Sequence, residues 1–182
     1  MTNRWPPFSV IEIETAGTAL PKPESPRSIH SIEGIGDRMR VAAFAEIQAR
    51  DAFLWAIGRF PDAPDSLKQD WVRLSGDEQR HLDSLLARMA ELGIDPQGRT
   101  LTNDLWVSLT TCQTLREFML FIANAEERGR KAGMRFFESL HERDPVTAEI
   151  FRKIAEEEVA HIALAQIYFP DAVLSPEGVR KK

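Results

Sequence analysis

Residues 74–85 read LSGDEQRHLDSL, and this stretch decides the fold that we predict. It has the spacing of an apolar helical stripe, but Glu78 stands seven residues before Leu85, where another leucine is expected. His81, seven residues after Leu74, interrupts the same stripe. An ionised carboxylate that faces a core is costly unless a cation or a partner compensates it. The stretch therefore predicts a buried helix whose polar residues carry chemistry.

The chain shows helical periodicity in four places and sustained strand alternation in none, so we predict an all-α fold. Prolines at 61 and 64 end the first helix, and Pro170 ends the last. Short loops join the first helix to the second and the third to the fourth, which makes each pair antiparallel. The predicted helices cover residues 37–59, 65–92, 115–142 and 145–169.

Three helix boundaries carry specific signals. Thr114 and Glu117 have the spacing of a capping box, in which each side chain binds a backbone N–H of the other residue. Asp144 suits an N-cap, and Pro145 is favoured at the first helical position. Gly93 suits the left-handed position just past a helix end. These signals predict where the second helix ends and where the third and fourth begin.

The two hairpins are connected by residues 93–112, a segment long enough to traverse a helix of about 35–40 Å. The second and third helices then run parallel, which closes a four-helix bundle in the ferritin-like way. We predict an extended proline-rich arm over residues 1–33, the bundle over 34–170 and a polar tail over 171–182.

The second hairpin repeats the polar pattern of the first. Each hairpin supplies a lone glutamate from its first helix and a Glu-x-x-His pair from its second helix. The i, i+3 spacing puts the carboxylate and the imidazole on one face, where both can reach one metal ion or adjacent ions. Counting residues from each loop places the members of each hairpin at one level along its helices. The candidate metal ligands are Glu46, Glu78, His81, Glu126, Glu158 and His161.

Four carboxylates and two imidazoles give two divalent cations about three donors each and leave coordination positions open. Iron and manganese suit that mixture. Zinc more often takes four tight ligands, calcium avoids imidazole, and magnesium keeps more of its water. We therefore predict two iron ions as the cofactor, with manganese as the alternative.

At this point the chain resembles the ferritin-like di-iron carboxylate superfamily, over about residues 35–170. Locally, the runs DEQRHL at 77–82 and AEERG at 125–129 are similar to the MiaE-like tRNA hydroxylases and to related uncharacterised ferritin-like proteins. The resemblance implies a ferritin-like four-helix bundle and a non-haem di-iron oxidoreductase of the hydroxylase or oxidase kind. Such an enzyme activates dioxygen or peroxide to oxidise a small-molecule substrate.

The chain departs from relatives that carry a tyrosine seven residues after the lone glutamate, because it has Phe53 and Gly133 at those positions. A mechanism that needs a tyrosine there is not expected. Cys112 is the single cysteine, which excludes an all-thiolate metal site, a rubredoxin-like module and an internal disulfide. We therefore expect an external electron donor.

Neighbouring acids compete for two of the ligand positions. Glu126 shares the apolar stripe of its helix and is preferred to Glu127. Glu158 is preferred to Glu157, which we assign to a solvated acidic edge, because only Glu158 has a histidine three residues further on. The alternative for the whole set is a bundle in which buried carboxylates pair with histidines or arginines and no metal binds.

Three further histidine and tyrosine positions receive simpler interpretations. Glu138 and His141 repeat the Glu-x-x-His spacing, but they lie off the stripe near a helix end, and we predict them on the surface. Tyr168 shares a face with His161 and is expected to complete the core. His30 is expected in solvent.

The net charge of −5 disfavours binding to nucleic acid through its phosphates. A tRNA substrate would need a local basic face, and we do not favour one; the only basic cluster is Arg128, Arg130, Lys131 and Arg135. No signal peptide and no apolar run of about 18 residues is seen, so we expect a cytoplasmic protein without a membrane span, with a homodimer as the assembly considered. The alternative functions are an iron-binding, ferroxidase or storage protein and a metal-free helical interaction module.

Overall fold

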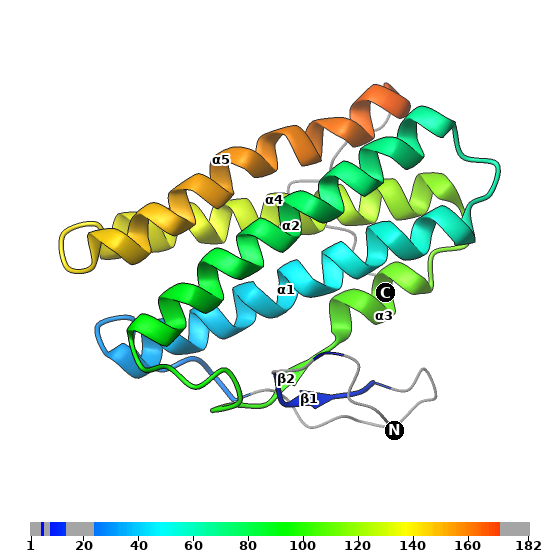
Figure 1. Ribbon diagram of the computed structural model, residues 1–182. Coiled ribbons are helices and arrows are strands. Elements are labelled where there is room, and N and C mark those ends of the chain that lie inside the picture. Colours follow the sequence, from blue (N-terminus) through cyan, green and yellow to red (C-terminus); the bar gives the residue numbers. More distant parts are fainter. Residues whose placement is uncertain (1–4, 6–7, 14–23, 172–182) are drawn as a thin grey trace. The chain divides into compact units, whose positions relative to one another are not determined.

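The computed structural model describes residues 5, 8–13 and 24–171, and this part of the chain is almost entirely helical (Figure 1). The prediction of an all-α fold is confirmed there, apart from one parallel pair of two-residue strands. The helices are α1 (Ile32–Arg59), α2 (Asp65–Glu91), α3 (Asp104–Thr110), α4 (Leu115–Leu140) and α5 (Pro145–Tyr168), and the strands are β1 (Val10–Ile11) and β2 (Leu101–Thr102).

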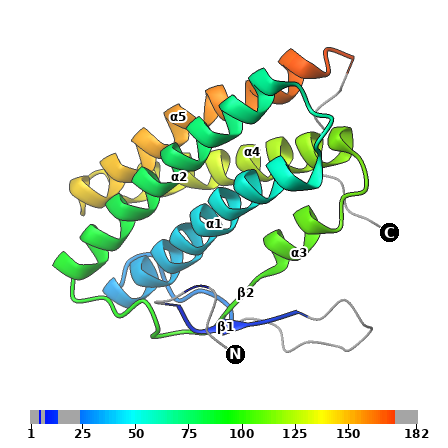
Figure 2. The same ribbon diagram turned by 45° about the vertical axis from the view of Figure 1, so that its right-hand side comes forward.

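The chain divides into two units. The first holds residues 1–58 and 66–110, and the second holds residues 59–65 and 111–182. The prediction of two antiparallel hairpins is confirmed, because α1 and α2 lie side by side in the first unit and α4 and α5 do so in the second (Figures 1 and 2). The closure of both hairpins into a ferritin-like bundle stays a prediction.

The start of α1 differs from the prediction. We expected the helix to begin near Asp37, but it begins at Ile32. The Ser31 hydroxyl accepts a hydrogen bond from the backbone N–H of Gly34 at 3.1 Å, which is the geometry of an N-cap. Ser31 and Asp37 are both of residue types that cap helices, so the sequence does not distinguish them. The carboxylate of Asp37 binds arginines instead.

Asp37 is buried and surrounded by arginines. Its carboxylate lies 2.6 Å from Arg27, 2.6 Å from Arg99 and 3.1 Å from Arg40. The hydrogen bond from the Arg27 side chain holds the pKa of Asp37 well below its ordinary value. Because Arg27 precedes α1 and Arg99 follows α2, this carboxylate ties two connecting segments to the first hairpin.

The core of the first unit follows the predicted apolar stripes. Burying a large apolar side chain contributes roughly 1.5–3 kcal/mol relative to leaving it exposed. Ala42 of α1 is only half-buried. The buried stripe residues are Met39, Phe53 and Ala56 of α1 and Leu67, Trp71, Leu74, Leu85 and Met89 of α2.

Two described aromatic residues of the predicted N-terminal arm are packed in the core. Trp5 and Phe8 are only 2% and 0% exposed, and both rings contact Phe44 of α1. Val10 of β1 pairs with Leu101 of β2. Isolated aromatic residues between prolines carry no periodic signal, so the sequence did not predict this packing. Residues 1–4, 6–7 and 14–23 of the predicted arm lie outside the described residues.

The connection after α2 contains structure that the sequence analysis did not resolve. Gly93 has a φ of +66°, which confirms its left-handed position past α2. The short helix α3 follows β2 and lies alongside α1 (Figure 2), where the side chain of Gln48 accepts a hydrogen bond from the N–H of Trp106 at 3.0 Å. Asn103 accepts one from the N–H of Ile13 at 2.9 Å.

The second unit begins and turns as predicted. Thr114 and Glu117 form both bonds of a capping box, and Asp144 caps α5 with Pro145 in its first turn. Gly133 lets α5 approach α4, because a Cβ atom there would lie 3.3 Å from the carbonyl oxygen of Phe151.

Helix α4 ends at Leu140, two residues earlier than predicted. Of the predicted tail, Asp171 pairs with Arg116 at 2.9 Å, and residues 172–182 lie outside the described residues.

Candidate metal centre

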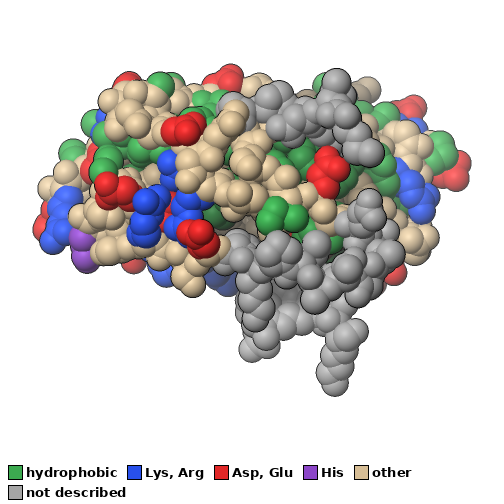
Figure 3. All heavy atoms as spheres, turned by 90° about the horizontal axis from the view of Figure 1, so that it is seen from below, with side chains coloured by type: hydrophobic (Ala, Val, Ile, Leu, Met, Phe, Trp, Pro, Cys, Tyr) green, Lys and Arg blue, Asp and Glu red, His purple; other side chains and the backbone are tan. Residues whose placement is uncertain are grey.

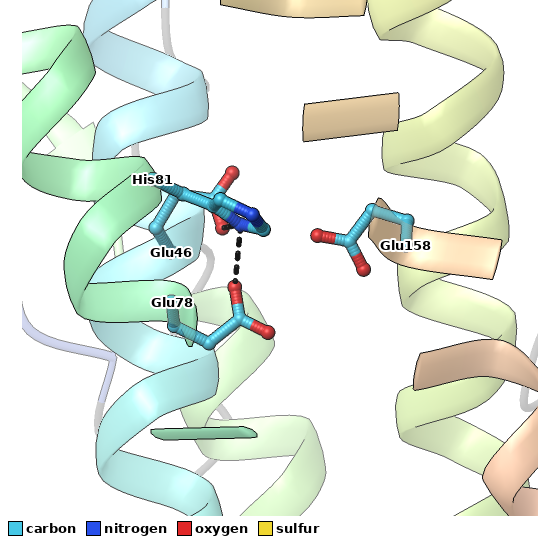
Figure 4. Close-up of side chains that lie close together, drawn as sticks. All are labelled: Glu46, Glu78, His81 and Glu158. Atoms are coloured by element: carbon cyan, nitrogen blue, oxygen red, sulfur yellow. Dashed lines mark ion pairs between the residues drawn. The ribbon is translucent and has the colours of Figure 1, made fainter. Parts of the chain in front are cut away.

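Three of the predicted ligand residues come together in the first hairpin. The Nδ1 atom of His81 lies 3.5 Å from a carboxylate oxygen of Glu46 and 3.4 Å from one of Glu78 (Figure 4). The ligand atoms of these residues all lie within 4.8 Å of one another. Glu78 is 0% exposed, His81 4% and Glu46 9%. We refer to these residues as the first triad.

Helix geometry explains why the first triad converges. Glu78 and His81 are one turn apart on α2, and both lie on the stripe that packs in the core. Glu46 lies on the corresponding stripe of α1, seven residues from Met39 and from Phe53, and both of those side chains are buried. The two helices are joined by a short loop, so the three positions lie at one level.

A hydrogen bond next to the first triad fixes the two helices against each other. Arg50, one turn after Glu46, donates to the side-chain oxygen of Gln79 at 2.6 Å. The same guanidinium donates to Asp51 at 2.7 and 3.0 Å. Sequence reasoning missed this contact, because Arg50 and Gln79 are far apart in the chain and neither interrupts an apolar stripe.

The first triad concentrates negative charge away from water. Glu46 and Glu78 place two carboxylates beside one imidazole there. Nearby, Arg50 pairs with Asp51, and Arg80 pairs with Asp77. Buried carboxylates are costly unless a cation neutralises them. The arrangement is therefore one that a bound cation would stabilise.

The donors fit a divalent transition metal. Carboxylate oxygen and imidazole nitrogen bind such ions at about 2.1 Å, so two donors on one ion lie roughly 3–4.2 Å apart. The spacings around His81 fall in that range. Glu46, Glu78 and His81 thus form a buried carboxylate–imidazole group that can hold a metal ion, although this chemistry does not select iron over manganese or zinc.

The second hairpin holds a matching pair. Glu158 and His161 of α5 are 2% and 5% exposed, and the His161 Nδ1 atom lies 3.1 Å from a Glu158 oxygen. Figure 4 also draws Glu158. Glu126 of α4 is half-buried, and its role as a ligand stays a prediction.

The residues that we set aside lie where the sequence placed them. Glu127 binds Arg130 at 2.6 Å and Lys131 at 3.1 Å, and the hydrogen bond from Arg130 lowers the pKa of Glu127 to about 2. Glu157 is exposed, which confirms the solvated acidic edge. Glu138 and His141 are exposed at the end of α4, so the prediction that this pair lies on the surface is confirmed.

The aromatic and histidine predictions have mixed outcomes. Phe53 is buried at 2% exposure. Tyr168 is half-buried, so it completes the core only in part. His30 is exposed, as expected.

The basic cluster of α4 is partly neutralised, because Arg130 and Lys131 both contact Glu127. On the face drawn in Figure 3, basic side chains stand beside acidic ones rather than forming a continuous basic field. Neither observation favours a nucleic-acid substrate. None of the helices within the described residues combines the length and the apolar character that crossing a membrane requires.

A comparison with known families gives one match. The family described as Protein of unknown function (DUF455) matches residues 14–176. No curated protein and no solved structure matches the chain.

Proposed function

The chain belongs to the family described as Protein of unknown function (DUF455), and from this premise we propose that it is a non-haem di-iron carboxylate oxidoreductase. The observation that carries the proposal is the first triad, in which two carboxylates and an imidazole are buried within 4.8 Å of one another. The stability of a helical core does not explain this arrangement, since apolar residues of similar volume stabilise such a core as well or better.

The second hairpin supplies the rest of the proposed site. Glu158 and His161 repeat the donor types and the spacing of Glu78 and His81, and they are equally buried. We propose that these residues, with Glu126, provide the remaining donors for two metal ions. The basis is the repeated sequence pattern and the donor chemistry of each hairpin.

Two redox-active iron ions would supply electrons to dioxygen or peroxide and so allow oxidation of a small-molecule substrate. The chain's own contribution is to hold the donors and to keep water away. Glu78 and Glu158, at 0% and 2% exposure, would offer carboxylates that need no reorganisation to bind a cation. Phe53 would keep one side apolar.

Electrons have to enter from outside. The chain has a single cysteine, so it carries no thiolate cluster that could act as an electron-transfer module. We propose an external donor as the reductant and a cytoplasmic location, where such donors and reduced thiols are found.

An anaerobic titration of the chelator-treated full-length protein with ferrous ion tests the proposal. We expect two ions bound per chain, followed by rapid oxidation of iron and uptake of oxygen when air is admitted. Binding of less than one ion would contradict the metal site, and bound iron that consumes no dioxygen or peroxide would contradict the oxidoreductase.

The same sample distinguishes the alternatives. A storage protein would retain many more ferric ions than two and assemble into a large shell, which light scattering detects. A metal-free interaction module would bind no iron, and Glu78→Gln would then leave every property except stability unchanged.

A further inference from the structure

Three of the four tryptophans form a contiguous array in the first unit. The Trp5 and Trp106 rings are 5.9 Å apart between centroids, and those of Trp106 and Trp55 are 6.3 Å apart, both edge to face. Trp5 is 2% exposed, whereas Trp55 and Trp106 are half-buried. The array therefore leads from a fully buried indole to two that reach the surface.

The array lies on the side of α1 that is opposite the first triad. At 3.6 residues per turn, Trp55 lies about half a turn around the helix from Glu46. Phe44, whose ring is 5.4 Å from that of Trp5, lies at a similar angle. The width of one helix, about 10–12 Å with side chains, separates the Phe44 side of α1 from the triad, and Trp55 lies about 13 Å further along the axis from Glu46.

Hydrogen bonds connect the buried end of the array to the helix that carries Glu78 and His81. The indole N–H of Trp5 donates to Asp51 at 2.9 Å. Asp51 also accepts hydrogen bonds from Arg50, and Arg50 donates to Gln79, which stands between the two ligands in sequence. A carboxylate at the indole N–H can take up the proton that an oxidised indole releases.

We propose that Trp5, Trp106 and Trp55 form a redox relay that passes electrons to the metal centre and is itself oxidised when no donor is present. This inference rests on the proposed function. The relay would bring the point of electron entry to the surface at Trp55 and Trp106.

Complete reduction of dioxygen to water requires a further source of electrons. Reduction of one dioxygen molecule to two water molecules consumes four electrons and four protons, and two ferrous ions supply two of the electrons on becoming ferric. In the absence of a donor, one tryptophan and one water molecule give a hydroxytryptophan, two protons and the two missing electrons. Dioxygen is the oxidant throughout, and the indole is oxidised.

The experiment uses the full-length protein, loaded anaerobically with ferrous ion and then exposed to oxygenated buffer without a reductant. Peptide mass spectrometry locates added oxygen atoms. We expect them on Trp55 and Trp106, and we expect ascorbate, as an added donor, to suppress them. Modification confined to Trp71, or spread over exposed methionines without any tryptophan, would overturn the relay.

Two variants separate a relay from simple exposure to oxidants. Trp106→Phe keeps an aromatic ring in the packing but removes the middle indole, so we expect oxygenation of Trp55 to fall several-fold. Trp71→Phe, the matched change in α2, is expected to leave the oxygenation of Trp55 as it is. Equal oxygenation of Trp55 in Trp106→Phe and in the native protein would contradict the relay.

The experiment distinguishes failure of the tryptophan relay from failure of the proposed function. A protein that binds iron and consumes oxygen but leaves its tryptophans intact retains the proposed function and loses the relay. A protein that binds no iron loses both.

Discussion

The two hairpins carry the same polar pattern and use it differently. In the first, the lone glutamate, Glu46, lies 3.5 Å from His81 and is nearly buried. In the second, Glu158 and His161 are in contact at 3.1 Å, while the lone glutamate, Glu126, is half-buried. A repeated motif therefore gives equal pairs on α2 and α5 but unequal surroundings for the third donor.

The difference lies in what supports each lone glutamate. Around Glu46, the bond from Arg50 to Gln79 joins the helices, and the N-terminal segment packs on the outer side of α1 through Phe44. In the second hairpin the helices meet at Gly133, where a side chain would crowd the backbone of Phe151. We therefore expect the first triad to be the better supported half of the proposed metal site.

The largest expected effect follows from removing a buried carboxylate from each hairpin. Glu78→Gln is expected to lower the affinity for ferrous ion by roughly 100-fold or more. Changing a residue that only supports a metal ligand already lowers metal affinity by about 10–100-fold. The matched change in the second hairpin is Glu158→Gln, and we expect a smaller loss. Anaerobic titration measures both.

Thermal unfolding of the metal-free variants is the control. Replacing a buried carboxylate with a neutral amide removes a desolvation cost, so the metal-free Glu78→Gln protein is expected to be at least as stable as the native one. Unchanged metal affinity in both variants would contradict the roles proposed for the two hairpins.

The next comparison is between two adjacent acids of α4. Glu126→Gln is expected to weaken binding of one ion by about 10–100-fold, on the scale of residues that hold or support a metal. Glu127→Gln is expected to leave metal binding unchanged, because Glu127 is held by Arg130 and Lys131. The reverse result would move the ligand to Glu127.

A smaller effect is expected from the contact that joins α1 and α2. Gln79→Ala removes the acceptor of the Arg50 hydrogen bond. A hydrogen bond with one charged partner contributes about 1.5–3 kcal/mol. If half of that free energy is lost from the metal-bound state, the affinity for ferrous ion falls by roughly tenfold. Arg73→Ala, an exposed change on the same helix, is the control and should not alter iron affinity. Equal affinities in the native protein and Gln79→Ala would show that the contact does not position the ligands.

The smallest effect concerns acid stability. Arg130 lowers the pKa of Glu127 from its ordinary value of 4.5 to about 2, so the folded protein binds fewer protons than the unfolded chain between these values. The contribution of Glu127 is therefore complete above pH 4.5 and is lost as the pH falls toward 2. For a partly exposed pair we expect about 1 kcal/mol or less.

Urea unfolding of the native protein and of Glu127→Gln, at neutral pH and near pH 2.5, measures this contribution. The two proteins should differ at neutral pH and converge in acid. A difference that grows in acid would contradict the assignment.

Much of the local structure could be predicted from the sequence. The capping residues Thr114 and Asp144, the left-handed Gly93 and the buried stripes of α1 and α2 all depend on interactions within a few residues of each other. The two Glu-x-x-His pairs were found for the same reason, since each pair is local to one helix.

Other features depend on contacts that cross the chain. We placed the start of α1 near Asp37, but the carboxylate of Asp37 forms an ion pair with Arg99, which lies far along the sequence. The pairing of β1 with β2, and the burial of Trp5 against Phe44, join segments that have no periodic pattern of their own. Two-residue strands are too short to leave a signal in sequence.

The sequence by itself determined four long helices, their pairing into antiparallel hairpins and the acidic and imidazole positions that interrupt the apolar stripes. These follow from the helical repeat, which acts over a few residues. Only the tertiary structure decided that Glu46 meets His81, that Arg50 joins Gln79 and that the tryptophans form an array. Such contacts are set by how whole helices and connecting segments pack, and side chains far apart in the chain do not encode one another locally.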